Sequence, residues 1–396
     1  MPSTTDAAAA TPQRVLPLIV LAQFAGTSPW FAVNAVMPEL QRQFGWPAQD
    51  IGLLSSAVQA GFIAGTLVFA LLALADRFPA RAVFVCCACA SAACTVAAAV
   101  SAGSFTALWA WRASTGFFLA GIYPVGMKLA AMWFPQGLGR ALGLLVGALV
   151  VGTASPHALR AVGAAWPWQA VFVGVTLLSL GAAAAVAWGL PDPPGRRAGA
   201  AGGLHFTALS SLWTDARVRA SALGYFGHMW ELYTLWVLLP LILATRLRGA
   251  ALSWAAFAVV AAGAIGCVAG GAGVARLGSA RVAAIQLALS GACCLAAPWL
   301  IDAPGPLFAC WLLVWGITVA GDSPQFSALT ATNAPRHAVG SVLTLVNSIG
   351  FAISAISLLV FAEAAREWPL ASLLPWLAPG PLLGLWALRP LWRQQR

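Results

Sequence analysis

Four ionisable residues inside otherwise apolar stretches are the best candidates for chemistry in this sequence. Arg112 lies in LWAWRASTGFF, His228 and Glu231 lie in GHMWELY, and Asp322 lies in GDSPQ. A charge in hydrocarbon is costly, so such residues normally face a bundle interior or a wet cavity and pair with one another. Imidazole and carboxylate groups exchange protons, and a guanidinium attracts anions. The four residues therefore indicate proton exchange or anion binding inside a membrane.

Each of the four also has a structural interpretation, and the sequence leaves both open. Arg112 is able to extend its guanidinium to the membrane surface. His228 and Glu231 are three residues apart on one helix, so they can touch and form either a proton acceptor or a structural network. Asp322 is close to Pro324 and could instead bond backbone N–H groups that the proline frees.

The composition places the whole chain in a membrane. Of 396 residues, 61% are hydrophobic and 8% are charged, far below the charged share of a soluble protein. The net charge of +10 comes from scattered residues without a nucleic-acid-binding motif, so no nucleic-acid partner is predicted. All eight cysteines lie in apolar runs without a neighbouring histidine or carboxylate, so neither a metal nor another cofactor is predicted. HExxH, GxSxG and GxxxxGK[ST] motifs are absent, which argues against an enzyme and against ATP as the energy source.

Apolar runs long enough to cross a bilayer recur along the chain, and they predict an all-α membrane protein with twelve transmembrane helices. The predicted spans are 15–38, 51–74, 82–101, 105–127, 141–160, 168–189, 220–243, 252–274, 282–301, 305–326, 340–362 and 370–388. Residues 1–14 form a polar tail that is predicted to be disordered and cytoplasmic. Residues 190–219 are rich in Pro, Gly and Arg and predict a cytoplasmic linker between two six-helix halves, 15–189 and 220–396.

Basic residues predict the orientation of these spans. Most lysines and arginines fall in connections on the side of the N-terminus, and the opposite side carries only Arg42, Arg160, Arg246, Arg248 and Arg366. Because cytoplasmic loops carry the excess of positive charge, both termini are predicted to be cytoplasmic.

The two halves repeat at an offset of about 200 residues, which predicts pseudo-symmetry between them. The matching residues are Gly116 with Gly316, Ala120 with Ala320, Gly121 with Gly321, Pro124 with Pro324, Pro135 with Pro335, and Trp30 with Trp230. Parallel six-helix repeats are an architecture of membrane transporters, with the substrate near the midplane between the repeats.

The connection between the second and third spans carries a more specific motif. It reads LALADRFPAR over residues 72–81 and resembles the pattern Gly-x-Leu-Ala-Asp-Arg-x-Gly-Arg-Lys/Arg of the major facilitator superfamily. Leu72 and Pro79 replace the two glycines. Arg112 followed by small residues also resembles the fourth-helix pattern of that family. On these motifs the chain resembles the superfamily over essentially its full length.

The resemblance implies a twelve-helix fold of two pseudo-symmetric halves and a cytoplasmic latch formed by Asp76, Arg77 and Arg81. The second copy keeps Arg276 but has Ala275 in place of the aspartate. Spans one, four, seven and ten line the pathway in that family, so Arg112, His228, Glu231 and Asp322 become cavity or coupling candidates. The residues expected to contact the substrate are Trp30, Asn34, Tyr123, Trp230, Tyr233 and Asn347.

The resemblance further implies a secondary active transporter that works by alternating access, is coupled to protons and carries a small solute. An organic or inorganic anion is one candidate substrate because of Arg112. Proton-driven efflux of amphipathic compounds is the alternative, and a sensor with a transporter fold but no flux is a third. The expected partners are the substrate, the proton and the lipid bilayer, and the chain is expected to be a monomer in the cell inner membrane.

Overall fold

The computed structural model describes residues 13–47, 50–134, 138–192, 210–335 and 338–393, and within this part of the chain every regular element is a helix. The elements of the first half are α1 (Val15–Thr27), η1 (Ser28–Phe31), α2 (Ala32–Phe44), α3 (Asp50–Leu71), α4 (Leu74–Arg77), α5 (Ala80–Val100), α6 (Phe105–Leu119), α7 (Tyr123–Trp133), α8 (Leu138–Val162), α9 (Gln169–Ala184) and η2 (Ala185–Gly189). Those of the second half are α11 (Ser211–Thr214), α12 (Ala216–Ala244), α13 (Gly249–Leu277), α14 (Ser279–Leu300), α15 (Gly305–Gly321), α16 (Ser323–Asn333), α17 (Val339–Ala364), α18 (Leu370–Leu373), η3 (Leu374–Leu377) and α19 (Pro379–Arg393).

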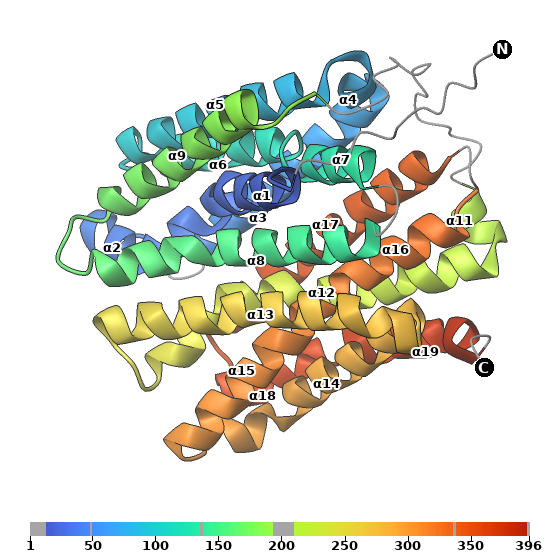
Figure 1. Cartoon of the computed structure of the whole chain (residues 1–396). Coiled ribbons are helices and arrows are strands. Elements are labelled where there is room, and N and C mark those ends of the chain that lie inside the picture. The colour runs from blue at the N-terminus through green and yellow to red at the C-terminus, as the bar shows by residue number, and fades with distance from the viewer. Residues whose placement is uncertain (1–12, 48–49, 135–137, 193–209, 336–337, 394–396) are drawn as a thin grey trace, which may run out of the picture.

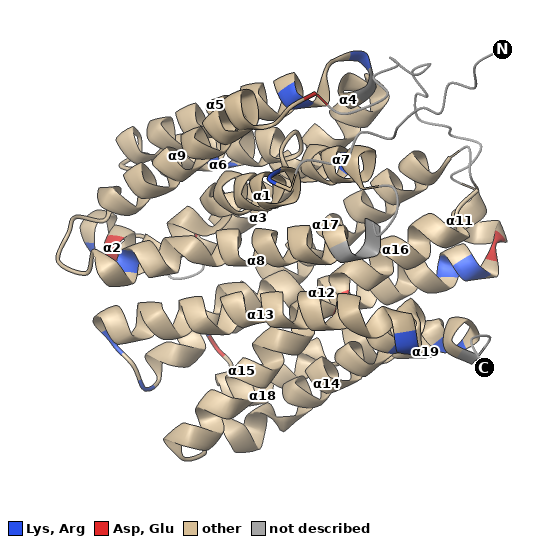
Figure 2. Cartoon of the chain, viewed as in Figure 1, with Lys and Arg blue, Asp and Glu red and all other residues tan. Residues whose placement is uncertain are grey.

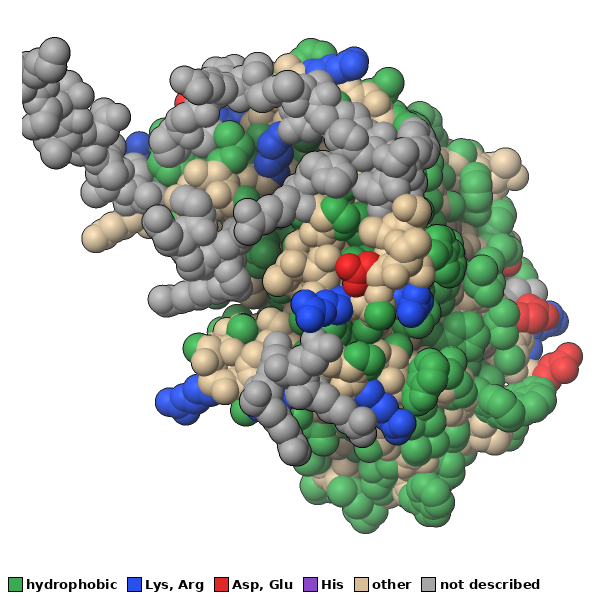
Figure 3. Space-filling view, turned by 90° about the vertical axis from the view of Figure 1, so that its right-hand side faces the viewer, with side chains coloured by type: hydrophobic (Ala, Val, Ile, Leu, Met, Phe, Trp, Pro, Cys, Tyr) green, Lys and Arg blue, Asp and Glu red, His purple; other side chains and the backbone are tan. Residues whose placement is uncertain are grey.

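These elements make twelve helices that are long and apolar enough to cross a membrane, which confirms the predicted fold class. The first six spans lie largely above the last six in Figure 1, and the described chain begins at α1 and stops at α19 at the same end of the bundle, referred to below as the end that carries the termini. The charged residues that Figure 2 shows lie mostly near the helix ends. Figure 3 looks onto the end that carries the termini, and lysine and arginine side chains are scattered over the face that it shows. The predicted tail and most of the predicted linker lie outside the described residues.

Three spans contain a helix break, and each extends six or seven residues beyond its predicted end. The first span runs from Val15 to Phe44, the fourth from Phe105 to Trp133 and the tenth from Gly305 to Asn333. Prolines stand at the first or second position of η1, α7 and α16, where a missing backbone N–H costs nothing. The repeated Pro124 and Pro324 therefore begin equivalent second segments in spans four and ten.

Glycine contacts give the pseudo-symmetry a physical basis. A Cβ on Gly116 of α6 would lie 2.0 Å from the carbonyl oxygen of Val58 on α3, and a Cβ on Gly316 of α15 would lie 2.1 Å from that of Val259 on α13. The second and fourth spans of each half thus approach so closely that only glycine fits at this position. The repeat at an offset of 200 residues preserves the same helix crossing twice.

We expect Gly116→Ala and Gly316→Ala each to destabilise the protein, since the added methyl group would collide with rigid backbone. Overpacking of this kind costs about 1–3 kcal/mol. The measurement is the thermal midpoint of the purified protein in detergent. Gly181→Ala is the matched control because a Cβ there meets nothing within 4 Å, and its midpoint should not fall. Equal midpoints for all three variants would contradict the close packing.

Candidate binding site between the two halves

A small pocket lies where the two halves meet, near the middle of the bundle. Its lining comes from α7 and α8 of the first half and from α12, α15, α16 and α17 of the second. The lining residues are Tyr123, Val146, Leu149, Val150, Tyr225, Met229, Leu232, Tyr233, Trp236, Ala320, Ser323, Ser327, Asn347 and Phe351. Aromatic and aliphatic side chains make up most of this lining, the polar groups are hydroxyls, one indole N–H and one amide, and no charged side chain occurs among these residues.

The pocket is narrow, with a volume of about 30 Å³. A water needs about 10–15 Å³ of such space, whereas small-molecule sites measure about 300–1,000 Å³. The pocket therefore has room for one or two waters and must widen before it can hold a solute. Because both halves contribute to the wall, a movement of one half against the other would widen it.

A buried aromatic cluster joins the halves beside the pocket. Trp30 and Phe31 of η1 stack on Tyr233 of α12 with ring centroids 5.8 and 6.2 Å apart. Phe62 of α3 packs on Phe351 of α17 at 4.6 Å. Each of these five side chains is at most 5% exposed. Offset and tilted ring pairs of this kind favour the closed arrangement.

The cluster lies on the side of the pocket away from the termini. Tyr225 and Trp236 both line the pocket from α12, which starts at the end that carries the termini. Trp236 is eleven residues farther along, which corresponds to about 16 Å of helix, and its ring packs edge-on against Phe31 at 5.9 Å. The aromatic cluster therefore closes the far end of the pocket.

Only part of the predicted contact set reaches this pocket. Tyr123, Tyr233 and Asn347 line it, and Trp30 belongs to the adjoining aromatic cluster. Asn34 instead donates its side-chain amide to Oγ of Ser55 within the first half, at 2.9 Å.

Trp230 is also displaced from the predicted position, since it lies on a different face of α12. Its Nε1 donates to the carbonyl of Trp376 at 3.3 Å, and its ring packs against Phe361. It lines an apolar groove between α12, α17 and α19. The match between Trp30 and Trp230 fails in space because the first span breaks at Ser28–Phe31, whereas α12 is continuous.

Arg112 is fully buried and does not belong to the lining of the pocket. One terminal nitrogen of its guanidinium donates to the carbonyl of Pro29 at 2.8 Å, and the other donates to the carbonyl of Trp30. Both acceptors lie in η1, at the break of the first span. Backbone groups at a break inside a membrane need such partners. The guanidinium thus does not extend to the membrane surface, and its hydrogen bonds go to backbone carbonyls rather than to the side chain of another candidate residue.

Glu231 lies inside the second half, in a cage of three donors. Oε1 accepts from Nε1 of Trp315 at 2.5 Å and from Sγ of Cys294 at 3.3 Å, and Oε2 accepts from Oγ of Ser290 at 3.0 Å. The carboxyl group is fully buried and connects α12 with α14 and α15. Ser290 and Cys294 are four residues apart on α14, so this spacing on one helix face was the available sequence signal for the cage.

His228 pairs with Asp322 rather than with Glu231, which corrects the predicted pair. Its Nδ1 lies 2.8 Å from Oδ1 of Asp322, and both side chains are at most 1% exposed. Asp322 stands at the break between α15 and α16, which brings its carboxyl group to α12. Nε2 of His228 has no hydrogen-bond partner among the residues that the structure describes. The pair lies directly behind the pocket wall, because Ser323 and Tyr225, next to its members, both line the pocket.

The four residues of the predicted latch lie at the end that carries the termini. The side chain of Asp76, in α4, lies outside the described part of the structure. Arg77 and Arg276 are exposed, at the ends of α4 and α13. Ala73, just before α4, has a φ of 50° and makes the turn that a glycine would make more easily.

Arg81 connects α5 to the segment that follows the sixth span. Its Nη1 lies 3.0 Å from Oδ1 of Asp192, and its Nη2 donates to the carbonyl of Ala187 at 2.7 Å. Ala187 belongs to the first half and Asp192 to the start of the linker, so neither contact reaches the second half. In this structure the arginine therefore fixes the end of the sixth span to the loop between spans two and three.

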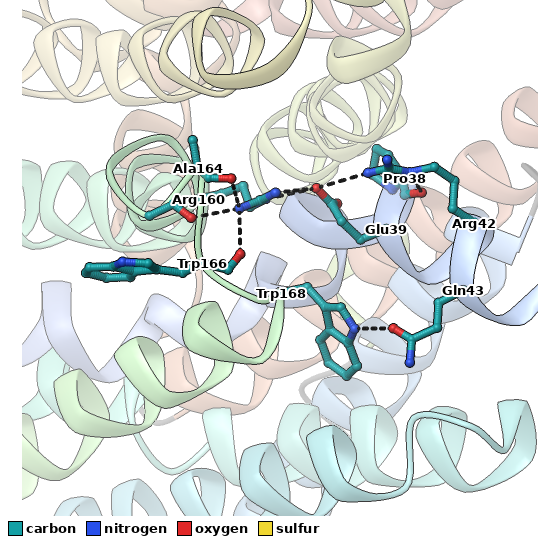
Figure 4. A network of polar contacts seen from close by, with 9 residues as sticks. Pro38, Glu39, Arg42, Gln43, Arg160, Ala164, Trp166 and Trp168 are labelled. Carbon is teal, nitrogen blue, oxygen red and sulfur yellow. Dashed lines mark hydrogen bonds and ion pairs between the residues drawn. The ribbon is translucent and has the colours of Figure 1, made fainter.

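A second polar network closes the opposite end of the first half (Figure 4). Arg160 of α8 binds Oε1 of Glu39 on α2 at 2.7 Å and donates to the carbonyl of Gly163 at 2.8 Å. Nε1 of Trp168 donates to Oε1 of Gln43 at 2.7 Å. The sequence did not indicate a role for Glu39, because its partner Arg160 is 121 residues away. The network fixes α2 to α8 and to the following loop.

Comparison with known proteins gives the fold a family. The model of the Major Facilitator Superfamily matches residues 19–358. No curated protein matches the chain significantly. Among solved structures, the human organic anion transporter MFSD10 (TETRAN) matches with a TM-score of 0.75 and 18% identity, covering 95% of this chain and 99% of that one. At this identity the likeness concerns the fold alone, and the predicted fold is confirmed. The chain belongs to the Major Facilitator Superfamily and is a multi-pass membrane protein with the fold of its transporters.

Proposed function

We propose that the protein is a secondary active transporter for a small amphipathic solute that carries an aromatic ring or a comparable flat apolar surface. The observation that carries this proposal is the pocket between the halves, whose aromatic wall includes Tyr123 and Tyr233 and whose polar groups are neutral. Rings stack on flat apolar surfaces, and hydroxyl or amide groups fix their orientation. The narrow pocket supports a cycle in which the halves rock to open it to either side.

The division into functional units follows from the same proposal. Residues 15–189 and 220–396 form the two moving halves, and residues 190–219 connect them. The contacts between α8 and α13 and between α3 and α17 are the surfaces on which the halves would move. Small residues between α8 and α13 support such a movement. A Cβ on Gly147 would lie 3.5 Å from the Cβ of Ala264, which is an ordinary van der Waals distance.

An anionic substrate is the second candidate. The solved structure described above is that of an organic anion transporter, which favours this candidate by analogy of fold. The position of Arg112 does not add support, since its guanidinium is engaged by the carbonyls of η1 outside the pocket. Amphipathic solutes therefore fit the neutral wall better than small inorganic anions do.

Proton coupling is part of the proposal and is assigned to the pair of His228 and Asp322. A charge buried in the membrane needs a counter-charge or a proton. The pair carries no net charge either as an ion pair or as two neutral groups, and it lies beside the pocket wall at Ser323. Uptake of one more proton adds a charge, which favours a conformation in which water reaches the pair. Glu231, surrounded by donors, instead serves to connect helices of the second half.

The remaining roles follow the family motif and the distribution of basic residues. We assign Asp76, Arg77, Arg81 and Arg276 to a latch that steadies the cytoplasmic ends of the helices. Both termini are assigned to the cytoplasm and the chain to the cell inner membrane, as a monomer.

We expect Asn347→Ala to weaken solute binding about tenfold, which corresponds to one lost hydrogen bond of about 1.4 kcal/mol. Binding is measured by thermal shift of the purified protein against a panel of amphipathic compounds and small anions, and flux is measured in proteoliposomes. Asn333→Ala is the matched control, since that amide bonds the carbonyl of Leu329 in its own helix.

Three outcomes separate the candidate functions. Shifts with amphipathic compounds that Asn347→Ala reduces would support the proposal. Shifts confined to small anions would favour the second candidate. Binding without flux would mean a sensor and would overturn transport.

A further inference from the structure

A second, larger groove opens on the membrane-facing side of the second half. It lies between α14 and α19, which pack against each other, at the end of the bundle that carries the termini. Its volume is about 1080 Å³, far more than that of the central pocket. The side chains that matter here are Arg281 and Ile285 of α14 and Leu382, Trp386, Arg389 and Trp392 of α19.

The charged side chains of this groove lie at one end of it, and most of the apolar side chains lie farther along. Arg281 is in the first turn of α14, and Arg389 is in the last turns of α19, so both arginines lie near the same end of the bundle. Ile285 lies one turn deeper on α14, and Leu382 lies two turns deeper on α19, about 6 and 10 Å farther into the membrane. The groove is therefore cationic at its mouth and apolar below.

This order matches that of a phospholipid lying along the groove. Arginine binds phosphate oxygens through a planar fork of donors, and two arginines from different helices can embrace one phosphate. Trp386 is 61% exposed and lies between the two levels, where indole rings favour the membrane interface. Basic pockets between transmembrane helices are suited to the headgroups of anionic lipids.

The charge of the two helices decides which class of lipid fits. The segments 279–300 and 379–393 contain no aspartate or glutamate, so the charged side chains that these two helices bring to the groove are all positive. A zwitterionic lipid would bring its own cation to the same mouth, whereas an anionic lipid would not.

We propose that the groove between α14 and α19 binds one anionic phospholipid, with its phosphate between Arg281 and Arg389 and an acyl chain along Ile285, Leu382 and Trp386. The lipid belongs to the leaflet on the side of the termini. The site is independent of the solute pocket and of proton coupling, so the test of lipid binding does not depend on the proposed transport. Its effect would be to hold the ninth and twelfth spans together at that surface.

The test is a lipid titration of the purified full-length protein in detergent, followed by the thermal midpoint and by native mass spectrometry. Phosphatidylglycerol should raise the midpoint in a saturable way and give one retained lipid per chain. Phosphatidylcholine with the same acyl chains should do neither. Glycerol phosphate, which has the charge without the chains, should give no shift, and an equal shift would overturn the assignment to a lipid.

Variants locate the site. Arg389→Gln should weaken the apparent affinity for phosphatidylglycerol at least tenfold, and its exposed position keeps the fold intact. Arg217→Gln is the matched control, because Arg217 is an exposed arginine in the first turn of α12, at the same end of the bundle, and does not line the groove. Normal binding by Arg389→Gln would show that the arginine is not part of a lipid site, and an equal loss in Arg217→Gln would show that only general surface charge attracts the lipid; either result would overturn the proposal.

Discussion

Arg112→Ala is expected to lower the stability of the protein by about 3–5 kcal/mol and to leave the solute affinity of the remaining folded protein nearly unchanged. The guanidinium donates to the carbonyls of Pro29 and Trp30 at the break of the first span. Without it, these buried carbonyls lose charged donors in a place where water cannot replace them. The break also positions Trp30 and Phe31 in the aromatic cluster, so the loss should extend to the closure between the halves.

Two further variants separate the loss of donors from the loss of volume. Arg112→Met keeps most of the volume but no donor and should be nearly as unstable as Arg112→Ala. Arg112→Lys keeps a cation, but a single ammonium group lacks the fork that reaches two carbonyls, so an intermediate midpoint is expected. The measurements are thermal midpoint and solute binding on the same purified samples. A variant Arg112→Met with the wild-type midpoint but without solute binding would place the guanidinium in the binding site instead.

Hydropathy predicted the twelve spans because burial in a membrane requires long apolar helices, whatever they pack against. It ended the first span at residue 38, although the helix runs to Phe44, because the last turns carry polar residues that bind other parts of the protein. Glu39 and Gln43 in these turns bind Arg160 and Trp168. A hydropathy pattern reports contact with lipid and misses polar surfaces that are buried against protein.

The sequence was enough to predict which buried residues are ionisable, but it predicted only part of how they are arranged. The cost of a charge in hydrocarbon marked His228, Glu231 and Asp322, and all three are buried. Their partners were not predictable, since spacing along one helix can propose only neighbours on that helix. The partner of His228 is in another span, beyond a break that turns Asp322 toward it. Helix breaks thus decide both the pairing of charges and the different faces on which Trp30 and Trp230 lie.

Asp322→Asn is expected to reduce proton-driven accumulation of solute at least tenfold while solute exchange at equal pH on both sides continues. The asparagine keeps the size of the side chain and can still bond His228, but it cannot take up or release a proton. His228→Gln should act in the same direction, because it removes the other member of the pair. The measurement compares accumulation under an imposed pH gradient with solute counterflow in proteoliposomes.

Glu231→Gln is the control for Asp322→Asn, because it changes another buried carboxyl group that is not part of the pair of His228 and Asp322. Nε1 of Trp315 can only donate, and it already contacts Oε1 of Glu231 at 2.5 Å, so an amide must offer its oxygen there and turn its NH₂ group toward Ser290. The hydroxyl of Ser290 donates to Oε2 of Glu231, so it must turn its hydrogen away before its oxygen can accept from the NH₂ group. We therefore expect a lower thermal midpoint, with the coupling ratio retained in the folded fraction. If Asp322→Asn accumulates solute normally and Glu231→Gln does not, the proton is carried inside the cage, and the pair beside the pocket has a structural role.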